Sequence, residues 1–135
     1  MSVLVDTSIW SLAFRRDTPR GTAHEKELLE LIRDGRVVML GAVRQELLSG
    51  IRAPEQFRKL RDRLRAFPDV ALGPADHEEA ASCFNRCRSR GLQGSNTDFL
   101  LCAVALRLDV AIFTIDGDFT RFVRVLHVKL HEAPR

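Results

Sequence analysis

The chain has 135 residues, of which 45% are hydrophobic and 29% charged, and its 21 basic and 18 acidic side chains give a formal net charge of +3. This length predicts a single domain over residues 1–135 that buries a core without disulfide or metal support, and the composition excludes a disordered chain. No apolar run approaches the roughly 20 residues of a membrane span, and the first residues lack the pattern of a signal peptide, so we expect a cytoplasmic protein with no membrane partner.

The chain opens with an uninterrupted apolar run, Val3 to Val5, that leads directly into Asp6. A strand with one face in water would alternate apolar and polar residues, so this run predicts a strand buried on both faces, as in a parallel sheet. Ligands bind at the carboxyl ends of the strands in such sheets. Asp6 is therefore the first candidate for a functional carboxylate.

Helices and strands alternate along the rest of the chain. Thr7 or Ser8 can cap a short helix that runs to Phe14, and the polar residues that follow predict a loop. Apolar periodicity predicts helices over residues 24–33, 42–49, 54–67, 74–90 and 95–108, with a helical turn over 117–122. Short apolar runs predict strands over residues 37–40, 70–72, 110–113 and 125–130, the last at the sheet edge. This order indicates an α/β fold, a three-layer α/β/α sandwich with a mainly parallel central sheet.

Three cysteines, Cys83, Cys87 and Cys102, are an odd number in a chain without an export signal. A disulfide framework is therefore not expected, and we predict buried free thiols. Cys83 and Cys87 share a helix face with His77 nearby, but no second pair of ligands completes a zinc site.

Basic side chains crowd the helix predicted over residues 54–67 and the segment before it. Each of them can be explained by a solvated helix face. A basic surface beside an acidic site would instead favour a partner with a phosphate backbone. The candidates for contact with such a backbone are Arg15, Arg16, Arg52, Arg58, Lys59 and Arg61.

Four carboxylates occupy positions that a merely solvated role explains poorly. Asp6 and Asp116 each follow an apolar strand, so in a parallel sheet both side chains would lie at the same edge. Glu46 lies on or beside the apolar stripe of its helix, where a carboxylate needs a partner. Asp98 is near the start of a helix that is apolar all round, which places its side chain near the core.

Three of these acids also have structural alternatives. Asp6 could cap the helix that follows it, and Asp116 could be a turn residue. Asp98 stands three residues after Ser95, which fits a capping box. Several carboxylates in one place, however, repel one another unless a cation neutralises them. Oxygen ligands without accompanying cysteine or histidine suit Mg²⁺ or Mn²⁺.

The segments around the four acids resemble those of the PIN domain in order and spacing, and the compact length resembles a VapC-type toxin of a bacterial toxin–antitoxin pair. The segments are VLVDTS at Asp6, RQELLSG at Glu46, NTDFLLCAVA at Asp98 and FTIDGDF at Asp116. The resemblance covers nearly the whole chain. It implies a Mg²⁺-dependent endoribonuclease that hydrolyses RNA phosphodiester bonds with a metal-activated water, the four acids being its catalytic and metal-binding residues.

The same resemblance assigns supporting roles to Thr7, Ser8, Thr114 and Asp118. Ser8 and Thr114 would orient carboxylates or water, and Asp118 would assist as an outer ligand. The resemblance further implies a homodimer and an antitoxin protein whose tail blocks the acidic cleft.

Two other classes of function are weighed against this interpretation. A catalytically silent PIN scaffold that binds nucleic acid or protein would be indicated by a missing acid, but all four are present. An α/β phosphohydrolase or a phosphoreceiver domain also places an aspartate after its first strand. The first would have another aspartate where Ser8 stands, and the second would have an acidic pair before the active aspartate, so neither pattern fits.

Overall fold

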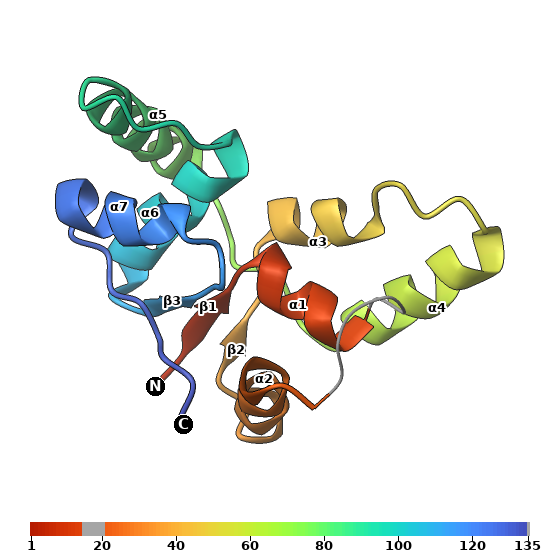
Figure 1. Ribbon diagram of the computed structural model, residues 1–135. Helices are drawn as coiled ribbons and strands as arrows, with labels where there is room; N and C mark the ends of the chain where they lie inside the picture. Colours follow the sequence, from red (N-terminus) through yellow and green to blue (C-terminus); the bar gives the residue numbers. More distant parts are fainter. Residues whose placement is uncertain (15–20, 135) are drawn as a thin grey trace.

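The structure of the chain is a computed structural model that describes residues 1–14 and 21–134. The described residues form three short strands and seven helices (Figure 1). The strands are β1 (Val3–Val5), β2 (Val37–Val38) and β3 (Ala111–Phe113). The helices are α1 (Thr7–Phe14), α2 (Ala23–Arg33), α3 (Gly41–Leu48), α4 (Pro54–Leu64), α5 (Pro74–Arg88), α6 (Asn96–Leu108) and α7 (Asp118–Leu126).

The three strands form a parallel sheet in the order β2-β1-β3. Val5 at the end of β1 pairs with Phe113 at the end of β3, and the Asp6 amide donates to the Phe113 carbonyl at 2.9 Å. The residues that follow these two strands therefore emerge side by side at one edge of the sheet. The continuous apolar run is explained by the central position of β1, whose three residues are all buried.

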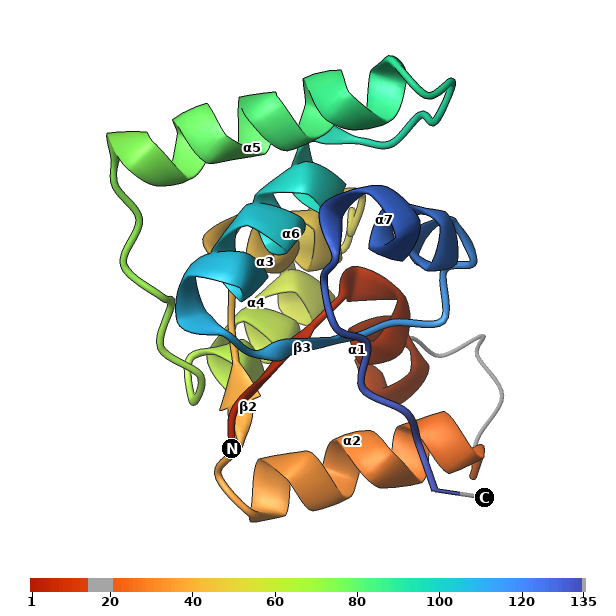
Figure 2. The same cartoon turned by 90° about the vertical axis from the view of Figure 1, so that its left-hand side faces the viewer.

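Helices cover both faces of the sheet, which confirms the predicted three-layer α/β/α fold. Figure 2 shows α2 on one side of the strands and α6 on the other, with α5 packed outside α6. Seven consecutive residues of α6, from Phe99 to Ala105, are buried. The helix predicted to have no wet face is therefore the central one. None of the helices in the described part of the chain is long and apolar enough to cross a membrane.

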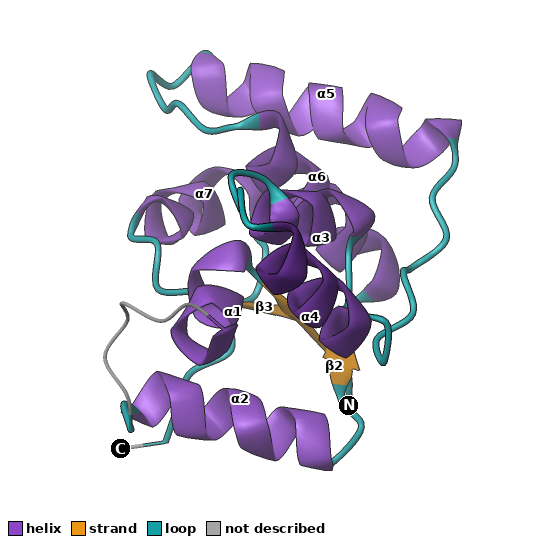
Figure 3. Cartoon of the chain, turned by 90° about the vertical axis from the view of Figure 1, so that its right-hand side faces the viewer, coloured by secondary structure: helices purple, strands orange, loops and turns teal. Residues whose placement is uncertain are grey.

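Helices α3 and α4 project together to one side of the sheet (Figure 1), and Figure 3 views them from that side. Arg44 on α3 joins the two helices. Its Nε and Nη2 donate to Asp69 Oδ1 at 3.0 and 2.8 Å, and its Nη1 donates to the Leu64 carbonyl at 3.0 Å. A fourth bond goes from Nη2 to the Phe67 carbonyl. One guanidinium thus fixes the turn after α4 against α3.

The strand predicted over residues 125–130 is wrong. Helix α7 continues to Leu126 and ends where His127 adopts a left-handed conformation with φ of 61°. Phe119, Phe122 and Leu126 recur at spacings of three and four and are buried, so the apolar residues at 122–126 serve a helix face. Beyond α7, Leu130 forms a single parallel bridge with Ile112.

Other predicted boundaries change less. The strand predicted over 70–72 is reduced to one bridge between Asp69 and Met39. The helix predicted over 54–67 ends at Leu64. The three cysteines are free and buried, as predicted.

Candidate active site

The four candidate acids line one hollow of about 560 Å³ at the carboxyl edge of the sheet. Asp6 reaches it from the end of β1, and Asp116 from the segment after β3. Glu46 comes from the middle of α3, and Asp98 from the first turn of α6. Four elements that are distant in the sequence thus bring their carboxylates to one place.

Asp6 is only 6% exposed and is held by hydroxyl groups. Its Oδ2 accepts hydrogen bonds from Ser8 Oγ at 2.7 Å and from Thr114 Oγ1 at 2.8 Å. The start of α1 uses the Asp6 main chain instead, since the amides of Ile9 and Trp10 donate to its carbonyl. The Asp6 side chain is therefore oriented by the Ser8 and Thr114 hydroxyls, while its backbone carbonyl accepts the first hydrogen bonds of α1.

The same hydroxyls bind the segment that carries Asp116. Thr114 Oγ1 accepts from the Asp116 amide at 3.0 Å, and Ser8 Oγ accepts from the Ile115 amide at 3.2 Å. Asp116 Oδ1 in turn accepts from the Asp118 amide at 2.9 Å, which is the turn role weighed for Asp116. Asp118 is exposed and contributes its backbone to this network.

Glu46 is exposed, so of the two places expected for it, it lies beside the apolar stripe of α3 and not on it. The buried residues of that helix are Val43 and Leu47, and Glu46 lies on the side turned to the hollow. The expected partner is present, because Thr7 Oγ1 donates to Glu46 Oε1 at 2.7 Å. This bond links the start of α1 to α3 across the hollow.

Asp98 is both a cap and a lining residue of the hollow. Its Oδ2 accepts from the Ser95 amide at 2.9 Å, and its own amide donates to Ser95 Oγ at 3.1 Å, which forms the predicted capping box. Burial raises the pKa of the Asp98 carboxyl, the hydrogen bonds with Ser95 lower it, and the negative charges of Asp6 and Asp116 raise it further. The net direction is upward, so an anion at this position is disfavoured until its charge is compensated.

The lining suits a hard divalent cation by its donor chemistry. Its four acids all offer carboxylate oxygens, and a cation would relieve the repulsion that raises the pKa of Asp98. Within the described residues, no three His, Cys, Asp or Glu side chains already stand close enough together to hold one ion. Mg²⁺ keeps several of its waters and needs only one or two carboxylates, so the residues fit the ion without forming a closed cage.

None of the described basic candidates lines this hollow. Arg58 and Lys59 are exposed on α4, Arg52 is exposed in the preceding loop, and Arg61 pairs with Asp62 at 3.1 Å. Arg15 and Arg16 fall outside the described residues. Contact of this surface with a nucleic-acid backbone stays a prediction.

Three polar residues of the hollow were not predicted. Gln45 precedes Glu46 on α3, Ser49 is the C-cap residue that follows this helix, and Thr97 precedes Asp98. The i, i+4 spacing of Gln45 and Ser49 is the signal that could have placed them on one helix face with a polar role.

Comparison with known proteins places this geometry in context. The model of the PIN domain family matches residues 3–125. The comparison with curated proteins gave no match. Solved structures with a similar fold include FitAcB from Neisseria gonorrhoeae, with 18% identity, a TM-score of 0.75 and 97% of each chain covered. VapBC2 from Rickettsia felis, bound to a DNA fragment from its promoter, has 18% identity and a TM-score of 0.76, with 97% of this chain and 98% of that chain covered. FitAB bound to an IR36 DNA fragment has 16% identity and a TM-score of 0.73, with 96% and 93% covered.

Proposed function

The chain belongs to the PIN-domain family, and on this premise we propose that it is the toxin of a toxin–antitoxin pair, an endoribonuclease that uses Mg²⁺ or Mn²⁺. The observation that carries the proposal is the convergence of Asp6, Glu46, Asp98 and Asp116 on one hollow. PIN domains are generally nucleases, and an acidic, hard-oxygen lining suits hydrolysis of a phosphodiester bond with a divalent cation.

Asp6, Asp98 and Asp116 would hold the ion, with Glu46 at the exposed rim. When bound, the ion would lower the pKa of a water molecule and neutralise charge that develops on the phosphoryl oxygens. Ser8 and Thr114 keep Asp6 in one orientation, because both hydroxyls donate to the same carboxylate oxygen.

Glu46 has a separate role in the proposed reaction. Thr7 holds the Glu46 carboxylate in place, and as the exposed member of the four it can receive the proton that water loses when its oxygen attacks phosphorus. The bond from phosphorus to the 3′ oxygen would then break, and this oxygen would take up a proton from solvent, which leaves a 3′-hydroxyl and a 5′-phosphate.

The partner proposed for this toxin is an antitoxin protein whose tail occupies the acidic hollow. The support is the fold shared with VapBC2 and FitAB, which are toxin–antitoxin complexes, and the negative lining of the hollow, which suits a basic side chain of the partner. A homodimer is proposed for the active form on the basis of the resemblance to PIN-domain toxins.

The direct test is incubation of purified protein with labelled RNA and Mg²⁺, with EDTA and the Asp98→Asn variant as controls. Wild-type protein should cut the RNA, and both controls should reduce the rate by at least about a hundredfold. The matched variant Asp34→Asn, at the exposed end of α2, should retain the wild-type rate. Equal cleavage by Asp98→Asn or in EDTA would exclude the carboxylate–metal mechanism.

A second candidate is a catalytically silent PIN scaffold that binds nucleic acid or protein. It is favoured by the finding that no three acids in the described part of the chain already form an ion site. It predicts RNA or protein binding without cleavage at any Mg²⁺ concentration, and the same incubation separates the two.

A further inference from the structure

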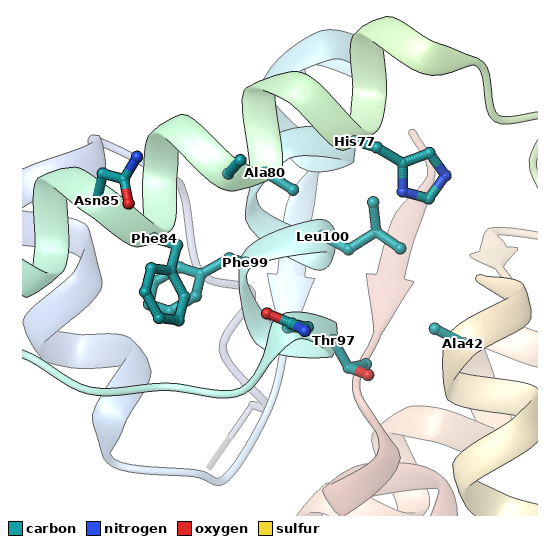
Figure 4. A pocket seen from close by; sticks show the side chains of 10 residues that line it. Ala42, His77, Ala80, Phe84, Asn85, Thr97, Phe99 and Leu100 are labelled. Carbon is teal, nitrogen blue, oxygen red and sulfur yellow. The ribbon is translucent and has the colours of Figure 1, made fainter.

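A second groove, of about 500 Å³, adjoins the acidic hollow (Figure 4). It lies between α5 on one side and α6 with the start of α3 on the other. Ala42 and Thr97 line both the groove and the hollow, so the two lie side by side. An extended ligand bound at the hollow could therefore reach the groove past these two residues.

The lining of this groove differs in kind from that of the hollow. Its floor is apolar: Phe99 and Leu100 are buried, and Phe84 is partly buried. Phe84 meets Phe99 edge to face at 5.5 Å, which fixes the ring while leaving part of it accessible. None of the residues that line the groove is an aspartate, glutamate, lysine or arginine.

Polar groups stand around this apolar floor. His77 and Asn85 are exposed on α5, and Asn96 is exposed at the start of α6. Figure 4 shows the His77 ring and the Asn85 amide near opposite ends of the groove. An imidazole and two amides supply both hydrogen-bond donors and acceptors.

An aromatic and aliphatic floor with hydrogen-bonding side chains at its edges suits a flat heteroaromatic ring. A nucleobase has that form, since it stacks through its faces and is recognised through its edges. A helix from a protein partner would need a longer apolar strip and would gain little from the two amides.

We propose that this groove binds an unpaired base of the RNA substrate, next to the phosphate held in the acidic hollow. The proposal rests on the proposed function, and it adds a site that selects the sequence to be cut. Ala42 and Thr97 place one end of the groove beside the scissile phosphate, and Asn96 and, toward the far end, Asn85 offer amides to the edge of a base lying on the floor (Figure 4).

The test measures binding separately from cleavage. Short fluorescent homopolymer RNAs of each base are titrated with protein in EDTA, and fluorescence anisotropy reports their affinity. The Ala80→Leu variant fills the groove, and the Asn85→Ala variant removes one amide without changing its floor. Ala75→Leu is the matched control, because Ala75 is exposed on the same helix and does not line the groove.

Wild-type protein should prefer one base. Ala80→Leu should weaken binding of that homopolymer by about tenfold or more and reduce the preference, whereas Ala75→Leu should match wild type. Asn85→Ala should reduce the preference with a smaller loss of affinity. If Ala80→Leu does not fold, the Asn85→Ala result alone decides the proposal.

Unchanged affinity and unchanged base preference in both groove variants would overturn the proposal. Size-exclusion chromatography of the same variants detects another occupant. If Ala80→Leu changes the oligomeric state while its RNA binding stays the same, a second copy of the chain covers the groove and the proposal fails.

Cleavage assays distinguish this failure from that of the proposed function. If Asp98→Asn loses cleavage but the groove variants keep the wild-type base preference, the protein is a nuclease and the base site is rejected. Base-selective binding that depends on the groove, without cleavage by wild type, retains the base site and rejects the nuclease.

Discussion

Asp98 carries two roles that act on its charge in opposite directions. As the last member of a capping box it accepts a hydrogen bond from the Ser95 amide, which favours the carboxylate. As a partly buried lining residue it loses hydration and is repelled by Asp6 and Asp116. Burial and charge repulsion outweigh the hydrogen bond, so the pKa of Asp98 is raised and its carboxylate form is disfavoured.

Asp98→Asn should therefore stabilise the metal-free protein at neutral pH, because asparagine can also cap α6 but carries no charge. The folded pKa of Asp98 is raised, so protonation favours folding. The advantage of the variant should be largest above that pKa and vanish as the pH falls below the ordinary carboxyl range. Urea unfolding at several pH values, with EDTA present, measures the difference in stability between the variant and the wild type. A variant less stable than wild type at neutral pH would contradict this explanation.

At the scale of elements, the loop before α6 depends on the small size of Gly94. A Cβ atom there would lie 2.8 Å from Phe122 Cζ and 3.0 Å from two Phe99 ring carbons. Both rings are buried and their centroids are 5.0 Å apart, so neither ring can move easily to make room for the added atom.

Gly94→Ala should lower the free energy of unfolding by about 1–3 kcal/mol through this overpacking. Gly117→Ala is the control, because a Cβ at Gly117 meets nothing within 4 Å and its φ is −60°. Chemical denaturation of both variants measures the difference. Equal stability of the two would show that the loop can move away from the rings.

Arg44 controls the packing of α3 against the turn after α4. Its side chain is 22% exposed, and two of its bonds go to backbone carbonyls, so the contribution is larger than that of a surface ion pair. Arg44→Ala should cost about 2 kcal/mol. Arg44→Lys keeps the positive charge but lacks the several N–H donors of the guanidinium group. It should therefore recover only part of the stability that Arg44→Ala loses, in the same unfolding measurement. A midpoint unchanged in Arg44→Ala would mean that α3 is held by its apolar face alone.

The sequence predicts helices and strands correctly where an apolar pattern is compatible with one environment only. It predicts them poorly where a short apolar run is compatible with either a strand or a helix. The fully apolar α6 and the buried β1 were found because their patterns admit one environment. The run at 125–130 predicts a strand by its composition, but Phe119, Phe122 and Leu126 share a helix face, and the chain is helical to Leu126.

The same contrast holds for the site, at the scale of the whole molecule. Asp6 and Asp116 could be predicted together because parallel strands end at one edge. The bond from Thr7 to Glu46, and the presence of Gln45 and Ser49 in the hollow, depend on how α3 sits against α1. That placement arises from tertiary packing and from the Arg44 contacts, which no local pattern encodes.

The distribution of charge also acts over the whole molecule. The hollow is acidic, whereas Arg58 and Lys59 are exposed on the projecting α4. If α4 contacts the RNA backbone, Arg58→Ala should weaken binding equally for all sequences and reduce the slope of log affinity against log salt by about 0.7. Lys26→Ala on α2 is the control, because Lys26 is exposed on another helix and lines neither the hollow nor the groove. An unchanged slope would exclude Arg58 from the contact surface.

The central claim is that Asp6, Asp98 and Asp116 hold a divalent cation in the hollow, with Glu46 at its exposed rim. Anomalous diffraction from crystals grown with Mn²⁺ tests it most directly, because it locates the ion without reference to activity. The account predicts a manganese peak among Asp6, Asp98 and Asp116 in wild-type protein, and a weaker peak or none in Asp98→Asn. Manganese bound elsewhere on the wild-type protein, with none in the hollow, would contradict it.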